Sequence, residues 1–427
     1  MIKRFARLFV PFLISGLVIV GCNSNSGGEP NGSSDGKVKL VWWSSDNAAF
    51  EGANKKLIEK YQAAHGNVEI DLQTFPYDAL IQKLKAAFAS KNPPDIVQMF
   101  GTWVTEYAKN GLLEPAPDDA FKSELYDAAL GAYLYNGKVY GIPNEYNIEN
   151  DGVLVHKKMF DDAGIAYPPK TWDEVIGAAK RLTVTENGAI KIRGLDMTSS
   201  DSTNFMFLAM ILQQGAKYWT DDGHVNLTSP EAMKAMTALT DLLTKEKVSD
   251  LTLAGSTEEP YMVFFKGASA MTTAGPWTIS EGKDTFQVSD FEYIPFPSFT
   301  SQPPYFAAES GWGEVVAKKS KHAKEAWEFV RFMAEPENAK AWNVQTFTVP
   351  ANKKVAEDPE FVQEVPAMKT SLEALQYGQW IGPVGDRDYW FKAVFDQFTS
   401  IGAGKISVED GLKKAQDAIN QMLDRNQ

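Results

Sequence analysis

Residues 37–99 alternate between strand patterns and helix patterns, and this alternation restricts the possible fold more than any other feature of the chain. Residues 37–43 become fully apolar, which is typical of a buried strand, and residues 68–72 alternate strictly between apolar and polar side chains. Apolar residues at helical spacing follow each segment, and a third apolar strand covers residues 96–99. A β-α-β-α-β order with right-handed crossovers predicts a parallel sheet covered by helices.

Length and charge narrow the class of protein further. A chain of 427 residues is too long for one ordinary hydrophobic core, so two domains are expected. Hydrophobic residues make up 44% of the chain and charged residues 23%, which are values typical of globular proteins. The net charge of −13 repels phosphate backbones, so we expect no nucleic-acid partner.

The N-terminus has the pattern of an export signal. Lys3, Arg4 and Arg7 precede an uncharged apolar run over residues 8–21, which is shorter than the roughly 20 residues that a membrane span needs. The run ends in Val-Ile-Val-Gly-Cys22, which resembles a bacterial lipobox. Cys22 is the single cysteine of the sequence. These features predict a signal peptide at 1–21 and lipid attachment at Cys22; the alternative is an ordinary exported protein with an incidental cysteine.

A Gly, Ser and Asn-rich segment at 22–36 follows, and its composition predicts a flexible tether. The predicted location is therefore outside the cytoplasm of a bacterium, anchored by lipid to the outer face of the cell membrane.

The segment FFKGASAMTTAGPW, from Phe264 to Trp277, predicts the most informative local structure. A short helix ends at Gly267, a strand of small residues covers 268–272, and a Gly-Pro turn places Trp277 at the start of a helix. The end of a strand beside a helix N-terminus is where α/β proteins tend to bind ligands. The segment resembles the FxxGxAAM…GPW signature of the extracellular solute-binding proteins that serve ABC sugar importers, the family that includes the maltose-binding protein.

Other stretches share this resemblance across nearly the whole chain after the leader. Residues 139–146 (VYGIPNEY) resemble the first crossing between the two lobes of that family, 292–296 the second crossing and 349–352 the third. The PPKTWDE stretch and the GWG stretch resemble family motifs as well. Residues 155–157 read Val-His-Lys where relatives usually carry Tyr-Asn-Lys, so no ligand role is assigned to them.

The resemblance implies a two-lobe periplasmic-binding-protein-like fold of type II. In this fold class, α/β, each lobe is a mainly parallel sheet flanked by helices, and hinge crossings join the lobes. The implied boundaries place lobe 1 at 37–145 and 296–348, and lobe 2 at 146–295 and, as C-terminal helices, 349–427.

Motifs of catalysis are missing from the sequence. The four histidines are scattered and form no metal pattern, and no G-x-S-x-G elbow occurs. Residues 402–405 (Gly-Ala-Gly-Lys) lack the upstream glycine and the following Ser or Thr of a P-loop. Asp221-Asp222-Gly223 lacks the ligand spacing of a calcium loop. We therefore expect no metal, no cofactor and no enzymatic activity, although 55 acidic residues leave a catalytic carboxylate pair open.

Sugars offer hydroxyls to carboxylates and amides, and C–H faces to aromatic rings. Trp277 and Trp390 stand where family motifs place stacking aromatics, while Trp103 and Trp312 suit a core as well as a site. Asp46 could bind hydroxyls or cap the following helix. Core packing is the better interpretation for Trp42, Trp43, Trp172, Trp327 and Trp342. The predicted ligand-binding set is Ser44, Asp46, Trp103, Glu145, Tyr146, Trp219, Trp277, Trp312 and Trp390.

These features predict a monomeric substrate-binding lipoprotein that captures a mono- to oligosaccharide between its lobes and delivers it to the permease subunits of an ABC importer. The importer is implied by the resemblance alone. The alternative is a surface-anchored glycoside hydrolase that uses two carboxylates of the cleft as acid and nucleophile or base.

Overall fold

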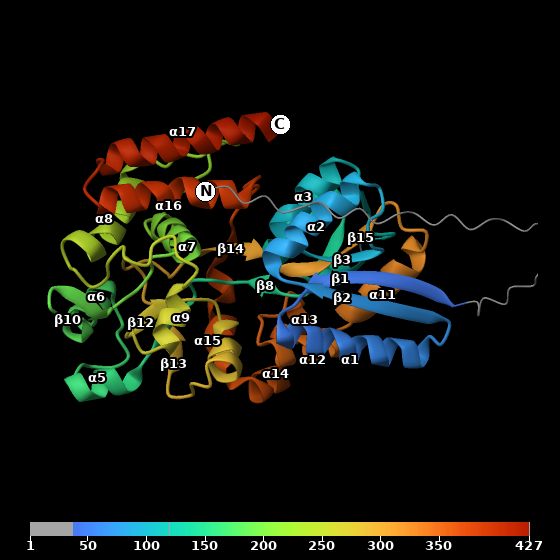
Figure 1. Cartoon of the computed structure of the whole chain (residues 1–427), viewed down its shortest axis with the longest axis horizontal. Coiled ribbons are helices and arrows are strands. Elements are labelled where there is room, and N and C mark those ends of the chain that lie inside the picture. The colour runs from blue at the N-terminus through green and yellow to red at the C-terminus, as the bar shows by residue number, and fades with distance from the viewer. Residues whose placement is uncertain (1–36, 119, 427) are drawn as a thin grey trace, which may run out of the picture. The chain divides into compact units, whose positions relative to one another are not determined.

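The computed structural model describes residues 37–118 and 120–426, and the chain from Val38 onward forms one compact unit. The predicted signal peptide, the tether and Cys22 lie outside the described residues. Two large buried cores organise the unit, and we call the elements around them lobe 1 and lobe 2 (Figure 1). Among the described residues, no helix combines the length and the apolar character that a membrane crossing requires.

The sheet of lobe 1 confirms the predicted parallel start. β1 (Val38–Ser45) pairs in parallel with β2 (Val68–Phe75) and with β3 (Ile96–Phe100). β15 (Trp312–Ala317) lies antiparallel to β3 and also pairs with β4 (Leu113–Glu114) and β7 (Gly141–Pro143). β15, which follows β3 by more than 200 residues in the chain, therefore completes the sheet.

Amphipathic helices cover this sheet. The Asn47 side chain caps the first of them, accepting hydrogen bonds from the backbone of Ala49 at 3.0 Å and of Phe50 at 3.1 Å. That helix buries Phe50, Leu57 and Tyr61 at helical spacing, as its sequence predicts. The main helices of lobe 1 are α1 (Ala48–Ala64), α2 (Tyr77–Ala89), α3 (Gly101–Lys109), α11 (Ala323–Ala334) and α12 (Pro336–Thr346).

The sheet of lobe 2 differs from the prediction of a mainly parallel sheet. β12 (Met271–Thr273) and β13 (Glu292–Pro295) both run antiparallel to β9 (Gly152–Val155). The reason is the path of the chain: β9 carries it into lobe 2 and β13 carries it back. Within the described residues of this lobe, parallel pairing occurs as single bridges, Arg193 with Ser269 and Asp196 with Thr272.

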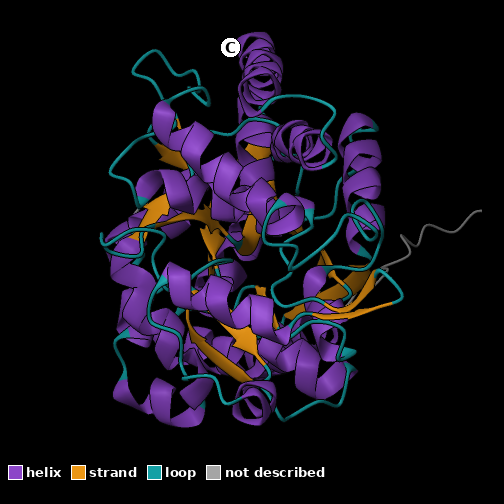
Figure 2. Cartoon of the chain, turned by 90° about the vertical axis from the view of Figure 1, so that its left-hand side faces the viewer, coloured by secondary structure: helices purple, strands orange, loops and turns teal. Residues whose placement is uncertain are grey.

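Helices surround these strands, as Figure 2 shows from the side of lobe 2. One helix begins at Ser200, and its residues from Thr203 to Leu212 are all buried. Ser229 caps the helix that begins at Pro230, through a hydrogen bond from the backbone of Ala232 at 3.1 Å. The helices of lobe 2 include α5 (Lys157–Ala163), α6 (Trp172–Leu182), α7 (Ser200–Leu212), α8 (Pro230–Thr244), α9 (Pro260–Phe265), α16 (Arg387–Gly402) and α17 (Val408–Asn426).

A small sheet lies between the lobes. β14 (Phe306–Ser310) pairs with β8 (Tyr146–Asn147) and with β16 (Gly378–Trp380), and β8 and β14 lie near the middle of Figure 1. Successive side chains of a strand point to opposite faces. Phe306 and Ala308 accordingly belong to the core of lobe 1, whereas Ala307 belongs to the core of lobe 2.

The C-terminal part of the chain divides between the two cores. We expected residues 349–427 to belong to lobe 2, but Val355, Phe361 and Met368 are buried in the core of lobe 1. The cause is contact of α13 (Lys353–Ala356) and α14 (Pro359–Glu364) with α12 of lobe 1. The C-terminal part joins the core of lobe 2 only from Ile381 onward.

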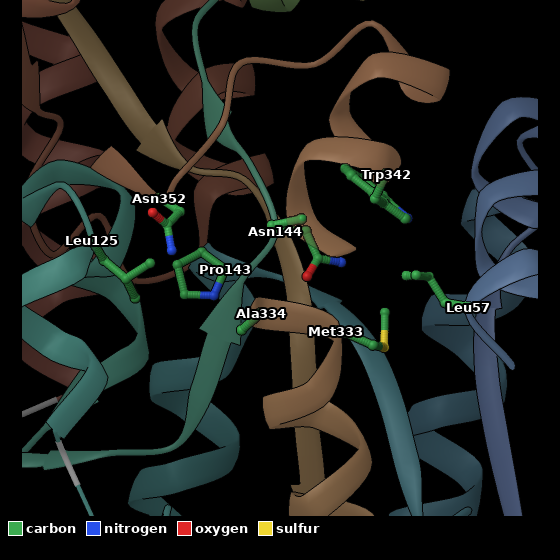
Figure 3. Close-up of a pocket in the computed structure, with 9 residues that line it drawn as sticks. Leu57, Leu125, Pro143, Asn144, Met333, Ala334, Trp342 and Asn352 are labelled. Atoms are coloured by element: carbon green, nitrogen blue, oxygen red, sulfur yellow. The ribbon is translucent and has the colours of Figure 1, made fainter. Parts of the chain in front are cut away.

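The crossing segments are tightly packed where they leave lobe 1. Pro143 and Asn144 of the first crossing lie among side chains of α1, α11 and α12 (Figure 3). The cavity that they line holds only about 10 Å³, roughly the space of one water molecule. The ends of the crossings are therefore fixed by packing.

The glycine that follows Trp312 tests this packing. A Cβ at Gly313 would lie 2.4 Å from the Ile142 carbonyl oxygen and 2.6 Å from the Pro143 Cα. Gly313→Ala is therefore expected to lower the free energy of unfolding by about 1–3 kcal/mol, the usual cost of overpacking. The matched control is Gly177→Ala, because Gly177 lies in α6 with no heavy atom within 4 Å of the added Cβ.

Chemical denaturation measures both variants. Gly177→Ala is expected to stabilise the protein by about 0.5–1 kcal/mol, since alanine favours a helix interior over glycine. Equal stability of Gly313→Ala and the unchanged protein would contradict the close approach of β15 to the first crossing.

Candidate functional site

A cavity of about 530 Å³ lies between the two lobes. Its walls come from the carboxyl ends of β1, β3 and β12 and from the N-terminal ends of α1, α2, α7, α9 and α16. These positions are where α/β proteins bind ligands, because loops and unsatisfied helix N–H groups meet there. The lining residues are Ser45, Asn47, Phe50, Tyr77, Phe100, Glu145, Asn147, Glu149, Asp201, Ser202, Glu259, Pro260, Tyr261, Thr273, Ala274, Trp277, Ser280, Glu281, Trp312, Thr346 and Arg387.

Aromatic rings form the wall of lobe 1. Trp312, the first residue of β15, makes edge-to-face contacts with Phe100 at 5.4 Å and with Trp103 at 5.5 Å between ring centroids. Tyr77 contacts the same indole at 6.0 Å, and Phe50 contacts it at 6.5 Å. The neighbouring rings hold the Trp312 ring in place while it lines the cavity.

Trp277 lines the wall of lobe 2. It follows the Gly275-Pro276 turn and directly precedes α10 (Thr278–Ser280), as the sequence predicts. The indole Nε1 donates a hydrogen bond to Glu149 Oε1 at 3.0 Å, and the ring lies edge-to-face on Tyr261 at 5.1 Å. The strand before the turn covers Met271–Thr273 instead of the predicted 268–272.

Two carboxyl groups stand on or just after the first crossing between the lobes, Glu145 buried and Glu149 half-buried. Glu145 accepts a hydrogen bond from the backbone N–H of Trp312 at 3.0 Å, and burial raises the pKa of its carboxyl to about 7. Glu149 accepts from Trp277 and from the backbone of Gly275 at 3.2 Å. Burial, with a smaller contribution from the charge of Asp201, raises the pKa of Glu149 to about 8. Both groups therefore bind protons near neutral pH.

Arg387 is held by two acidic side chains. Its Nη1 and Nη2 donate to the two oxygens of Asp201 at 3.1 and 3.0 Å. Its Nε and Nη2 donate to the two oxygens of Glu309 at 2.8 and 3.2 Å. The guanidinium also lies 4.2 Å from the centre of the Phe391 ring. The positive charge of Arg387 is thus compensated within the protein.

Of the predicted residues, Glu145, Trp277 and Trp312 line the cavity, and Trp103 supports Trp312 from behind. Ser44 is fully buried and its Oγ donates to Gln98 Oε1 at 2.8 Å. The next residue, Ser45, lines the cavity in its place, because neighbouring side chains of a strand face opposite ways. Asp46 is exposed and does not line the cavity.

Three other predicted residues lie away from the cavity. Tyr146 is buried and stacks with Tyr126 at 5.8 Å. Trp219 donates from Nε1 to the Ile381 carbonyl at 2.7 Å and packs against Trp390. Trp390 has no exposed surface and belongs to the core of lobe 2. Trp390 therefore packs in a helix core, which was the alternative to a role in ligand binding, and we assign this residue no ligand contact.

Sequence reasoning missed several polar and aromatic lining residues. Tyr261 lies one turn before the signature segment, and Glu149 follows the crossing motif by three residues, so proximity to recognised motifs was the available signal. Arg387 and Asp201 gave no such signal, because long-range packing brings them to the cavity. The missed lining residues with polar or ring-bearing side chains include Asn47, Tyr77, Asn147, Glu149, Asp201, Glu259, Tyr261, Glu281 and Arg387.

Comparison with known proteins identifies the family. Residues 44–340 match the model of the bacterial extracellular solute-binding proteins, and the chain belongs to that family. The arabinooligosaccharide-binding protein of Bacillus subtilis (strain 168) is 24% identical over 360 residues, which cover 81% of this chain and 80% of that protein.

Solved structures confirm the two-lobe α/β fold. An ABC transporter solute-binding protein from Thermotoga lettingae, bound to α-D-tagatose, superposes with a TM-score of 0.77 at 22% identity and covers 90% of this chain and 99% of that one. An ABC substrate-binding protein from Listeria monocytogenes, in complex with cycloalternan, superposes with a TM-score of 0.75 at 24% identity. The match covers 91% of this chain and 99% of that one. At such identity the likeness establishes the fold, and the ligands are those of the relatives.

A buried carboxyl in the sheet of lobe 1 predicts a pH dependence of stability. Glu314 of β15 is fully buried and accepts a hydrogen bond from Gln98 Nε2 at 3.4 Å. Burial, with a smaller contribution from the charge of Glu145, raises its pKa from an ordinary 4.5 to about 8. The folded state therefore holds a proton that the unfolded chain has released, so this stabilisation is complete below pH 4.5 and is lost as the pH rises towards 8.

Glu314→Gln keeps the size and shape of the side chain and removes its titrating carboxyl group. Its free energy of unfolding is expected to fall less between pH 5 and 8 than that of the unchanged protein, by at most about 1.4 kcal/mol per pH unit for one proton. Urea unfolding at several pH values measures this. Glu246→Gln is the control, because the hydrogen bond from Lys180 lowers the pKa of that carboxyl and keeps it ionised between pH 5 and 8. The same slope in Glu314→Gln and the unchanged protein would show that the carboxyl at 314 does not titrate in this range.

Proposed function

We propose that the protein is the substrate-binding component of an ABC importer, which captures a mono- to oligosaccharide in the cavity between its lobes and delivers it to permease subunits. The cavity itself carries this proposal: aromatic rings line both of its walls, and carboxyl and amide groups stand between them. This combination suits sugars, whose C–H faces pack on rings and whose hydroxyls bind carboxylates and amides.

The names of similar proteins point the same way. Relatives and structural neighbours bind an arabinooligosaccharide, tagatose and cycloalternan. A cavity of about 530 Å³ has room for more than one sugar ring and falls within the usual range of ligand sites. We therefore propose a saccharide ligand, with Trp277 and Trp312 as rings on opposite walls and Glu145 among the groups that bind hydroxyls.

The mechanism that we propose is hinge closure. Ligand that contacts both walls binds the closed arrangement more tightly than the open one, and only this difference in affinity shifts the equilibrium. The crossings offer the pivots. β7 pairs with β15 of lobe 1, and the β9 strand that follows it belongs to lobe 2. On β14, Phe306 and Ala308 belong to the core of lobe 1, whereas Ala307 belongs to the core of lobe 2.

Binding accounts for the carboxyl groups better than hydrolysis does. Glu149 already accepts two hydrogen bonds from lobe 2, and Asp201 is engaged by Arg387. Among the described residues, no group of three or more His, Cys, Asp or Glu side chains is arranged to hold a metal ion. Together with membership of a solute-binding family, these contacts favour a receptor that does not turn over its ligand.

We further propose that Cys22 is lipidated and anchors the protein to the outer face of the cell membrane, with 22–36 as the tether. Two acyl chains on one residue are enough for stable anchoring. Cys22→Ala is expected to move the protein from the membrane fraction to the medium or periplasm, measured by fractionation and immunoblotting. Continued membrane association of the variant after a salt wash would count against lipid attachment.

Small-angle X-ray scattering with a panel of sugars tests the function. A bound saccharide is expected to reduce the radius of gyration and to raise the melting temperature, since ligand binds the folded state alone. Product analysis of the same samples by chromatography addresses hydrolysis. An unchanged radius and melting temperature across the panel would oppose the proposal, and the release of shorter sugars would replace it with the hydrolase.

Trp277→Ala tests the proposed stacking residue. Loss of the ring is expected to reduce affinity for a bound sugar by about 1.5–3 kcal/mol, roughly tenfold to somewhat more than a hundredfold. The control is Trp327→Ala, because Trp327 is only 3% exposed in the core of lobe 1 and its removal should cost about 3–5 kcal/mol of stability. Calorimetric titration and thermal unfolding separate the two effects. Normal sugar binding by Trp277→Ala would make this residue part of the scaffold.

A further inference from the structure

The lobe 2 wall of the cavity carries an excess of acidic groups. Glu149 stands beside Trp277, Glu259 precedes α9, and Glu281 follows α10. We propose, building on the proposed saccharide ligand, that this ligand bears a protonated amine, which binds against Glu149, Glu259 and Glu281 with the rings of Tyr261 and Trp277 beside it. Four further observations carry this assignment.

The first observation is the lack of an available cation. Arg387 is the one basic side chain among the described residues that line the cavity, and Asp201 and Glu309 already engage it on both edges. A third carboxylate, that of Asp388, also lies near the guanidinium, with Oδ1 at 3.7 Å from Arg387 Nη1. The guanidinium thus has four acceptor contacts from two carboxylates, and an anionic ligand would have to displace them.

The second observation is that the carboxyls of the wall lack cationic partners. In the described part of the chain, the ion pairs do not include Glu149, Glu259 or Glu281, and Arg387 pairs with other acids. Asp201 and Glu145 add further acidic groups to the lining. When a ligand closes the cavity and expels water, ionised carboxylates without a cation are costly, whereas a bound cation compensates them.

The third observation is the ring geometry. Tyr261 and Trp277 meet edge-to-face at 77°, with 5.1 Å between ring centroids, and both line the cavity next to Glu149. Ammonium groups are attracted to the faces of such rings, most strongly where water is excluded. An amine on a sugar ring can therefore gain from the rings and the carboxylates together.

The fourth observation is an unpartnered polar atom. Thr273 ends β12 and is only 1% exposed, yet it lines the cavity and its Oγ1 has no hydrogen-bond partner. Buried hydroxyls without partners are uncommon, and here a ligand group in the cavity would satisfy the oxygen. A hydroxyl oxygen accepts a hydrogen bond from an ammonium group.

The protonation of these carboxyl groups agrees with this arrangement. Burial raises the pKa of Glu149 to about 8 and also raises the pKa of Glu259, so part of the acidic charge is neutral without ligand. Tyr261 faces the same groups, and burial raises the pKa of its hydroxyl, so it remains neutral. Binding of a cation is then expected to release protons to the buffer.

Isothermal titration calorimetry with matched sugar trios tests the proposal. Each trio contains a hexose, its hexosamine and its uronate, in the gluco, galacto and manno series, and as short oligosaccharides; choline and spermidine serve as cations that are not sugars. The expected result is that a hexosamine binds at least tenfold tighter than its hexose, that the uronate binds weakest, and that hexosamine binding releases protons and weakens with salt.

Variants of the acidic wall complete the test. Glu259→Gln is expected to reduce the preference for hexosamine over hexose severalfold, and Glu281→Gln serves the same purpose should the first variant fold poorly. The matched control is Glu246→Gln, because the Glu246 carboxyl belongs to lobe 2, pairs with Lys180 and does not line the cavity. This variant should keep the full preference.

The possible failures are distinguishable. If a hexose or a uronate binds as tightly as its hexosamine, the amine proposal is wrong and the saccharide-binding function stands. If choline or spermidine binds and no sugar does, or if no compound in the panel binds, both proposals are wrong.

Discussion

The ion pair between Glu309 and Arg387 is the interaction on which the arrangement of the two walls depends. Glu309 has no exposed surface and stands on β14, the strand that lies between the lobes, while Arg387 begins α16 of lobe 2. Burial raises the pKa of Glu309 even though Arg387 opposes this effect. A charge in such a place must be paired, because removal of one partner typically costs about 3–5 kcal/mol.

The pair also decides the electrostatic character of the cavity. Arg387 extends from Glu309 to Asp201 at the start of α7, so one guanidinium joins the shared strand to two helix N-termini. Its charge is then no longer available to a ligand. What remains for recognition in the wall of lobe 2 is acidic and aromatic. The contacts of Arg387 with Glu309 and Asp201 therefore both connect the structural elements and limit the charge that a ligand can carry.

Local sequence patterns predicted the elements well, because their causes are local. The cap at Ser229 and the spacing of apolar residues in α1 depend on neighbours within one or two turns. The cap of α1 is Asn47 and not Asp46, the residue that we considered for this role. At Thr171 the cap also forms, with a hydrogen bond from the backbone of Glu174, although the Glu174 carboxylate accepts from Lys170 instead of from Thr171. The residue that makes a capping hydrogen bond can therefore differ by one position from the prediction while the helix itself is unchanged.

Pairing between distant segments was harder to predict. The antiparallel sheet of lobe 2 follows from the chain entering along β9 and leaving along β13, and the resemblance suggested the crossings but not this direction of pairing. The C-terminal segment divides between two cores for a similar reason: α14 reaches α12, whereas α16 reaches α7. Propensity and periodicity contain no information about which distant partner a face will meet.

The tryptophans show why residue type alone does not define a site. Trp312 and Trp390 are both large rings beside other rings, yet Trp312 keeps one side towards the cavity and Trp390 is enclosed by Trp219 and the core of lobe 2. On a strand, the parity of a position decides the face, which is why Ser45 and not Ser44 lines the cavity. On α16, by contrast, apolar residues occur on several sides, and only the packed neighbours decide which ring is covered. The polar lining depends still more on tertiary structure, since Glu149, Glu259 and Glu281 come from three separate segments of the chain that line one wall. Their number matters because no ion pair among the described residues compensates these carboxyl groups.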